Sequence, residues 1–166
     1  KFRDVGAWYH IIVVLDTTQA VATNRIKLYV NGELIPSSDF LHHWSSAWTQ
    51  LAQNSDRQFN AALPHKIGAR IDNIQPLDGY LAEVNFIDGQ ALTPADFGET
   101  DEDYGHWKPI EYTGTYGTNG FYLDFKTSGN LGDDVSGNTN DWTVNNLVAT
   151  DQMLDSPTNN FCTLNP

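Results

Sequence analysis

The strongest constraint on the fold of this chain is the pair Asn31-Gly32, which lies between two runs of strand-forming residues. In the preceding run, Ile26–Val30, apolar residues occupy every second position, as in a β-strand with one buried face. The following run is Glu33-Leu34-Ile35. An Asn-Gly pair favours a two-residue type I′ turn, because both of its residues tolerate the positive φ angles that this turn requires. We therefore predict a β-hairpin centred on Asn31 and Gly32.

Other segments repeat this strand-and-turn pattern. Residues 7–16 contain a β-branched and aromatic run that is apolar on both faces, which predicts a central strand covered on two sides. Further strands are predicted at residues 65–71, 80–87, 120–125 and 141–145, with a change of phase near Glu83 that suggests a bulge. The chain also has 15 Asn, 15 Thr and 13 Gly, a composition rich in turn-forming and strand-compatible residues. Together these features predict an all-β fold.

Only two short helical segments are expected. Thr93 as N-cap, Pro94 as the first helical residue and Gly98 as the stop predict a single helical turn. Apolar residues spaced at i, i+3, i+4 and i+7 between Trp44 and Leu51 fit a short amphipathic helix.

Charge and hydropathy exclude several classes of partner. The formal net charge is −12, and no basic stripe is visible, so we expect binding to neither nucleic acid nor anionic membrane surfaces. The longest apolar run, Ile11–Leu15, is far too short for a transmembrane helix, so no membrane insertion is expected.

Several segments resemble a known family, and they occur in that family's order. Residues 7–16, residues 26–32, the pair Ile67-Gly68 and residues 77–84 are similar to the middle of a concanavalin A-like, laminin-G-type jelly roll. A closer resemblance is to modules in structural proteins of tailed, especially marine, bacteriophages. It is carried by residues 86–94, 112–123 and 141–146.

This resemblance implies an antiparallel, concanavalin A-like jelly-roll sandwich that is partial and continues into an extended C-terminal segment. It implies three parts: the back of a jelly roll at residues 1–98, a linker at 99–119, and a strand-and-extended segment at 120–166 that resembles the start of a second module. The family's first strands have no counterpart before residue 7. We therefore expect a neighbouring subunit or further sequence to cover the apolar strand.

The function implied by the resemblance is that of a non-enzymatic structural or adhesive module of a phage virion, in the tail or its fibres. Its expected partners are other virion subunits, with the chain itself forming a homo-oligomer, and its expected location is the surface of the particle. The alternative is a carbohydrate-binding module that recognises host glycan, with calcium as an optional aid. A glycoside hydrolase is the third hypothesis, since laminarinase-type enzymes share this fold.

The hydrolase hypothesis requires paired carboxylates. Retaining glycosidases place an acid and a nucleophile about 5–5.5 Å apart, and in the laminarinase type both lie on a Glu-x-Asp-x-x-Glu strand. The nearest match here is the run from Glu99 to Tyr104, which has Tyr in place of the final Glu. We therefore predict no catalytic residues and no enzyme activity.

The stretch with most recognition character contains His42, His43, Trp44 and Trp48. Tryptophan faces stack on sugar rings and are favoured at protein interfaces, but they also cover the ends of β-sandwiches. Core packing, a protein interface and glycan binding therefore all stay open for these four residues. His10, inside an apolar strand, is interpreted as a hydrogen-bonded structural histidine.

One loop resembles the start of a calcium site. Asp134, Ser136 and Asn138 alternate oxygen-bearing side chains as an EF-hand loop does, but the sixth position is Thr139 and the twelfth is Asn145. An Asx-rich turn is the preferred interpretation of this loop. We predict no cofactor, and calcium at these three weak candidates is the alternative.

Overall fold

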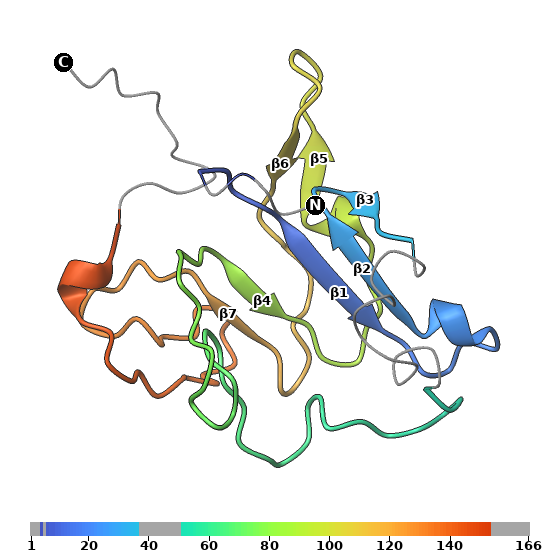
Figure 1. Cartoon of the computed structure of the whole chain (residues 1–166), viewed down its shortest axis with the longest axis horizontal. Coiled ribbons are helices and arrows are strands. Elements are labelled where there is room, and N and C mark those ends of the chain that lie inside the picture. The colour runs from blue at the N-terminus through green and yellow to red at the C-terminus, as the bar shows by residue number, and fades with distance from the viewer. Residues whose placement is uncertain (1–3, 5, 37–50, 154–166) are drawn as a thin grey trace. The chain divides into compact units, whose positions relative to one another are not determined.

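The computed structural model describes residues 4, 6–36 and 51–153. Throughout this part of the chain the regular elements are short β-strands and three 3₁₀ turns, and every strand pair is antiparallel (Figure 1). The predicted all-β, antiparallel fold is confirmed. Within the same residues, no helix has the length and hydropathy needed to cross a membrane.

The chain forms two compact units, each made of two separate stretches of sequence. Unit 1 combines residues 1–56 with 91–113, and unit 2 combines residues 57–90 with 114–166. This grouping differs from the division at residues 98 and 119 suggested by the sequence. In particular, residues 99–109, expected to be a linker, contain paired strands.

The larger sheet of unit 1 has three strands in the order β1-β2-β3. Strand β1 (Ile11–Leu15) pairs with β2 (Ile26–Val30), so that Ile11 faces Val30 and Leu15 faces Ile26. A 3₁₀ turn, η1 (Ala22–Asn24), leads into β2, and β3 (Glu33–Leu34) pairs with its end.

The predicted turn between β2 and β3 is confirmed. Asn31 and Gly32 have φ angles of 50° and 78°, and Val30 lies opposite Glu33, so the loop contains two residues. The turn is also tied to the residue before β1. The His10 N–H donates to Asn31 Oδ1 at 2.8 Å, and the Asn31 N–H donates to the His10 carbonyl at 2.8 Å.

The expectation that the first strand is central and covered on both faces is wrong for the described part of the chain. Strand β1 lies at the edge of its sheet, and the side chains of Ile11 and Val13 are 52% and 53% exposed. The register places both on the same face as Leu28 and Val30. The continuous apolar run therefore marks a sheet face that is only partly covered.

A second, two-stranded sheet completes unit 1. The predicted helical turn is present as η2 (Pro94–Asp96), and the Asp96 carboxylate accepts both the N–H and the hydroxyl of Thr93, each at 2.8 Å. The next residue, Phe97, is buried and stacks on Tyr112 with ring centroids 5.0 Å apart. Strand β5 (Gly98–Thr100) then pairs with β6 (Trp107–Pro109).

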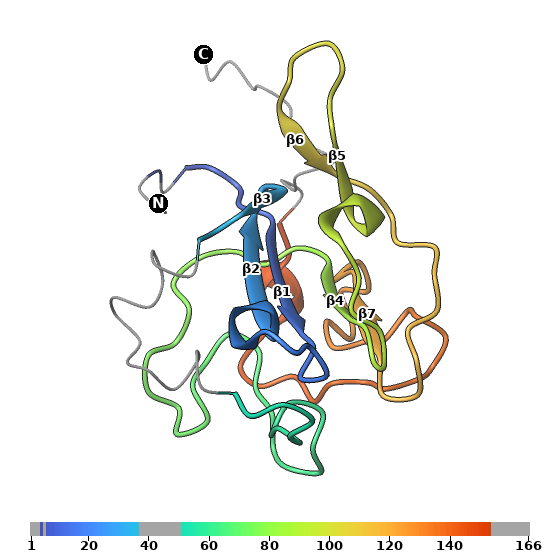
Figure 2. The ribbon, with the colours of Figure 1, turned by 90° about the vertical axis from the view of Figure 1, so that its right-hand side faces the viewer.

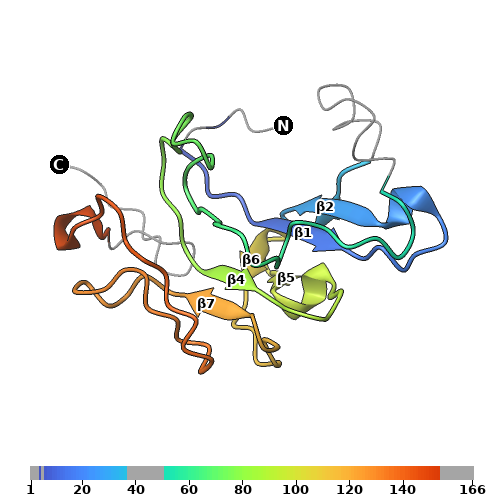
Figure 3. The same ribbon diagram turned by 90° about the horizontal axis from the view of Figure 1, so that it is seen from below.

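Unit 2 is organised around one short ladder, visible in Figure 3, between β4 (Val84–Phe86) and β7 (Phe121–Leu123). Leu123 is the most buried hydrophobic side chain of the described core, at 2% exposure. Phe121 stacks on Phe86 and meets the edge of the Trp142 ring, with centroids 5.4 and 5.0 Å away. A last 3₁₀ turn, η3 (Ala149–Asp151), follows.

The strands predicted at residues 65–71 and 141–145 are wrong, because both segments are irregular. Gly68 has a φ of 80°, which interrupts the first. In the second, Trp142 makes a single backbone bond to Gly132 and packs as a side chain on β7. The strand predicted at residues 80–87 is shortened to β4, because Glu83 has a φ of 54°.

The helix predicted between Trp44 and Leu51 falls outside the described residues, apart from its last position. Most of the extended C-terminal segment, from residue 154 onward, falls outside them as well.

Candidate functional site

The loop that joins β5 to β6 carries the most exposed aromatic side chain of the described surface. This loop, residues 101–106, is called the hairpin tip here. It extends away from the three-stranded sheet of the same unit (Figures 1 and 2). It is closed by two backbone hydrogen bonds, from the Asp101 N–H to the His106 carbonyl at 2.8 Å and from the Gly105 N–H to the Asp101 carbonyl at 2.9 Å.

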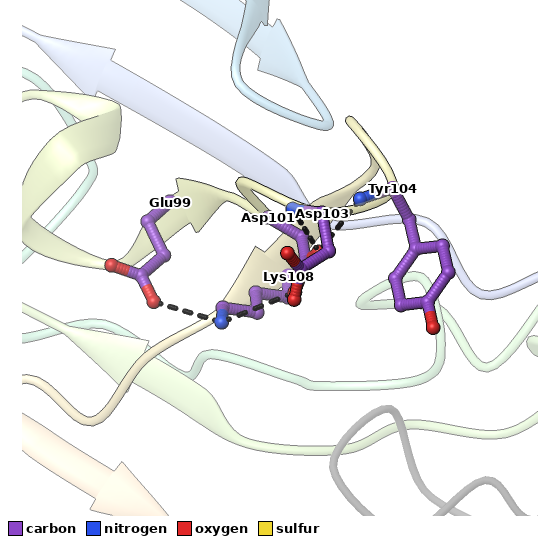
Figure 4. A network of polar contacts seen from close by, with 5 residues as sticks. All are labelled: Glu99, Asp101, Asp103, Tyr104 and Lys108. Carbon is purple, nitrogen blue, oxygen red and sulfur yellow. Dashed lines mark hydrogen bonds and ion pairs between the residues drawn. The ribbon is translucent and has the colours of Figure 1, made fainter.

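The Asp101 side chain organises the hairpin tip from inside (Figure 4). Its Oδ1 accepts the backbone N–H groups of Asp103 and Tyr104 at 3.0 and 2.9 Å. Its Oδ2 lies 3.4 Å from Lys108 Nζ, which also forms an ion pair with Glu99 at 3.1 Å. Glu99 and Lys108 are directly opposite in the strand register, so the ion pair braces the two strands just below the tip.

These contacts fix the charges of the site. The backbone N–H of Tyr104 first, then that of Asp103 and the Lys108 ammonium, hold the pKa of Asp101 below its usual value. Glu99 and Asp101 in turn raise the pKa of Lys108. Asp101 and Lys108 therefore both stay ionised near neutral pH.

Tyr104 lies at the end of the loop and is 83% exposed, more than any other large hydrophobic side chain described. Its ring is tilted against that of His106, with centroids 6.2 Å apart. Glu102 and Asp103, beside it, are exposed too. The tip thus presents an aromatic face among carboxylates, an arrangement suited to recognising a ring or a basic, partly apolar surface.

The base of the hairpin is held by Trp107. The Trp107 Nε1–H donates to Nδ1 of His10 at 2.8 Å, and the two rings stack with centroids 6.0 Å apart. Gly32 and Gly98 lie so close to the indole that a Cβ atom on either would overlap it. Burial lowers the pKa of His10. The interpretation of His10 as a hydrogen-bonded structural histidine is confirmed, and its partner anchors the hairpin.

The residues singled out in the sequence lie elsewhere. His42, His43, Trp44 and Trp48 lie outside the described residues. Asp134, Ser136 and Asn138 come together in unit 2, where the buried Asp134 carboxylate accepts three backbone N–H groups. The donors are Tyr122 at 2.8 Å, Ser136 at 2.9 Å and Asn140 at 2.8 Å.

Asn138 completes the same loop by donating its side-chain amide to the carbonyls of Gly117 and Gly120, at 2.6 and 2.9 Å. Burial raises the pKa of Asp134, but the N–H donors of Tyr122, Ser136 and Asn140 outweigh it and leave the pKa lowered. A cation would need these oxygens to face it instead of N–H groups. Among the described residues, no cluster of three or more His, Cys, Asp or Glu side chains is placed to hold a metal.

The hairpin tip and Trp107 were missed in the sequence. The run from Glu99 to Asp103 was interpreted as an acidic linker, because strands of three residues are too short to show a period of two. The available signal was Gly105, a turn-forming residue between Thr100 and Trp107.

With its antiparallel sheets and exposed hairpin loop, the chain is an all-β module. The family model of the concanavalin A-like lectin/glucanases superfamily matches residues 1–97, and the chain belongs to this superfamily. This confirms the predicted concanavalin A-like class of fold. The match ends before the hairpin tip. No curated protein and no solved structure matches the chain.

Proposed function

We propose that the chain is a non-enzymatic binding module and that its hairpin tip recognises the surface of another protein. The observation that carries this proposal is the 83% exposure of Tyr104 on a hairpin whose base is fixed by Trp107 and by the Glu99–Lys108 ion pair. Tyrosine provides a large amphipathic contact area at a low cost in side-chain entropy, and binding energy at interfaces is concentrated in such residues.

The charges of the hairpin support a non-enzymatic role. A glycosidase needs one carboxyl group whose pKa is raised so that it can donate a proton. The hairpin carboxylates nearest to the catalytic pattern are Glu99 and Asp101, and both are paired with Lys108. The pKa of Asp101 is lowered, which is the direction opposite to that of a general acid.

The setting of this proposal comes from the sequence resemblance. We propose a structural or adhesive subunit of a tailed bacteriophage particle, in its tail or fibres, with other virion subunits as partners. The segments at residues 86–94, 112–123 and 141–146, which resemble phage structural proteins, support this location in the virion. Mass spectrometry of purified particles is expected to detect peptides of this chain, and their consistent absence from intact particles would contradict the virion location.

A photo-cross-linking amino acid in place of Tyr104 tests the recognition role. When this labelled chain is irradiated with purified virion proteins, it is expected to form a discrete cross-linked adduct. An excess of the unlabelled chain is expected to suppress the adduct, whereas an excess of the Tyr104→Ala chain is not. The same cross-linker at Val21, an exposed apolar position of unit 1, is the control. Equal labelling from positions 104 and 21 would contradict the proposal.

Glycan binding is the second candidate function, since an exposed tyrosine ring flanked by Glu102 and Asp103 can stack on a sugar while carboxylates accept its hydroxyls. Glycan-array binding that is lost in Tyr104→Ala would favour this function. Loss of glycan binding in Trp44→Ala or Trp48→Ala would also favour a glycan-binding function. It would place the binding site in the stretch that contains Trp44 and Trp48 and not at the hairpin tip.

A further inference from the structure

A second exposed surface contrasts with the hairpin tip. Residues 57–81 of unit 2, called the basic segment here, form no strand or helix. The segment carries seven of the seventeen large hydrophobic side chains exposed in the described residues, among them Ile71, Ile74, Leu77 and Tyr80. Such a concentration of exposed apolar side chains is typical of a surface that binds a partner.

The charge of this segment is the reverse of that of the whole chain. Residues 57–81 contain three cationic residues, Arg57, Lys66 and Arg70, against Asp72 and Asp78, a net charge of +1, whereas the chain has a net charge of −12. The cations lie in residues 57–71, which contain no acidic residue. Two of these cations are held by neighbours, since Lys66 donates to the Asn73 side chain and Arg70 pairs with Asp72 at 2.6 Å. All three cationic residues are exposed.

The hairpin tip carries the charge opposite to that of the basic segment. Four of the five residues from Glu99 to Asp103 are acidic. The ion pairs of Lys108 involve Glu99 and Asp101, so the side chains of Glu102 and Asp103 are available beside the exposed Tyr104 ring. The tip offers an aromatic ring with carboxylates, and the basic segment offers apolar side chains with cations.

We propose that the hairpin tip of one copy of this chain docks onto the basic segment of a second copy. The inference rests on the proposed function and names the partner. The acidic tip and the basic segment belong to the same sequence, so a second copy supplies the charge complement of each. The repulsion between two chains of charge −12 is screened beyond about 8 Å at physiological salt, whereas charges in contact still attract.

The two surfaces differ, so the contact is head-to-tail, and each copy keeps one tip and one basic segment to offer. Contacts of this kind close into rings or continue as filaments, instead of stopping at a two-fold dimer.

Sedimentation velocity of the full 166-residue chain at physiological salt tests this arrangement. The unaltered chain is expected to be larger than a monomer. Glu102→Lys with Asp103→Lys reverses the tip, and Arg57→Glu with Lys66→Glu reverses the basic segment. Each pair is expected to weaken association about tenfold or more, because like charges then meet. An equimolar mixture of the two variants is expected to regain it.

The matched control for the tip variant is Glu33→Lys with Glu111→Lys, which raises the net charge by the same amount as the tip substitutions, at exposed positions outside both surfaces. Circular dichroism of all variants verifies that they are folded. A monomeric unaltered chain, an equal loss in the control, or no recovery in the mixture would each overturn the docking. If the docking fails while the cross-linker at position 104 still captures another virion protein, the proposed function stands and only its assignment to a second copy is lost.

Discussion

The hairpin of β2 and β3 lies against Trp107, which belongs to the hairpin of β5 and β6, but different interactions hold the two hairpins. The first is fixed by its own turn, where Asn31 and Gly32 adopt positive φ angles, and by a ladder to β1. The second has no third strand beside it in the described residues and depends on side chains. These are the Asp101 carboxylate, the Glu99–Lys108 ion pair and the Trp107 indole. A locally encoded hairpin thus supports one that is held by tertiary contacts.

Removing the indole is expected to have the largest effect. Trp107→Ala deletes the packing against Gly32 and Gly98 and the hydrogen bond to His10, and we expect a loss of about 3 kcal/mol in the free energy of unfolding. Urea unfolding measures it. Tyr104→Ala, at an exposed position three residues away, is expected to change stability by no more than about 0.5 kcal/mol. Equal losses in the two variants would show that Trp107 is not the anchor.

Alanine substitutions at two glycines of the same backbone conformation distinguish backbone strain from steric overlap with a neighbouring side chain. Gly32 and Gly89 have φ angles of 78° and 79°, but only Gly32 lies against the Trp107 ring. Gly32→Ala is therefore expected to destabilise the fold by about 1–3 kcal/mol more than Gly89→Ala, since overlap adds to the strain that both share. Thermal unfolding of both variants checks this. Similar melting temperatures would mean that the turn moves away from the ring at little cost.

The pH dependence of stability tests the His10–Trp107 contact. Nδ1 of His10 accepts a hydrogen bond, so protonation there removes the acceptor, and burial already lowers the pKa of His10 below its unfolded value. The stabilising contribution is therefore complete above the unfolded pKa, near 6.5, and is lost as the pH falls toward the folded pKa. Urea unfolding at several pH values is expected to show this decline, with a smaller one in His10→Gln. An identical decline in both would assign it to other groups.

The smallest effect is expected at the hairpin tip itself. Asp101→Ala removes the acceptor of the Asp103 and Tyr104 amides, whereas Asp101→Asn keeps an oxygen in the same place. Hydrogen exchange of these two amides is expected to be faster in the Ala variant than in the Asn variant, with little change in global stability because residues 101–106 contribute no side chain to the described hydrophobic core. Equal exchange rates in all three proteins would show that Asp101 does not organise the loop.

The sequence predicted those elements whose information is local. The Asn31-Gly32 turn, the strands on either side of it and the Thr93-Pro94 turn are specified by neighbouring residues, and all are present. The hydrogen-bonded role of His10 was also predictable, although its donor, 97 positions away, was not.

The wrong predictions fall where contacts between residues distant in the sequence determine the structure. Residues 65–71 have the composition of a strand, but no strand of the described residues forms a ladder with them. The hairpin tip was missed because an acidic run is indistinguishable from a linker until Lys108 and Trp107 are seen to hold it. Charge composition alone does not reveal which carboxylates share a cation.

The hydrogen bond between His10 and Trp107 sets the order in which unit 1 can form during synthesis. It joins positions 97 residues apart, and residues 57–90, which lie between the two halves of unit 1, belong to unit 2. The β1–β2 ladder ends at Val30, 77 positions before Trp107. At about 5–20 residues per second, the ladder is therefore made roughly 4–15 s before its indole partner. Strand β1, with Ile11 and Val13 exposed, is an edge strand during that interval as it is in the folded unit, and an open edge is a template for pairing with other chains.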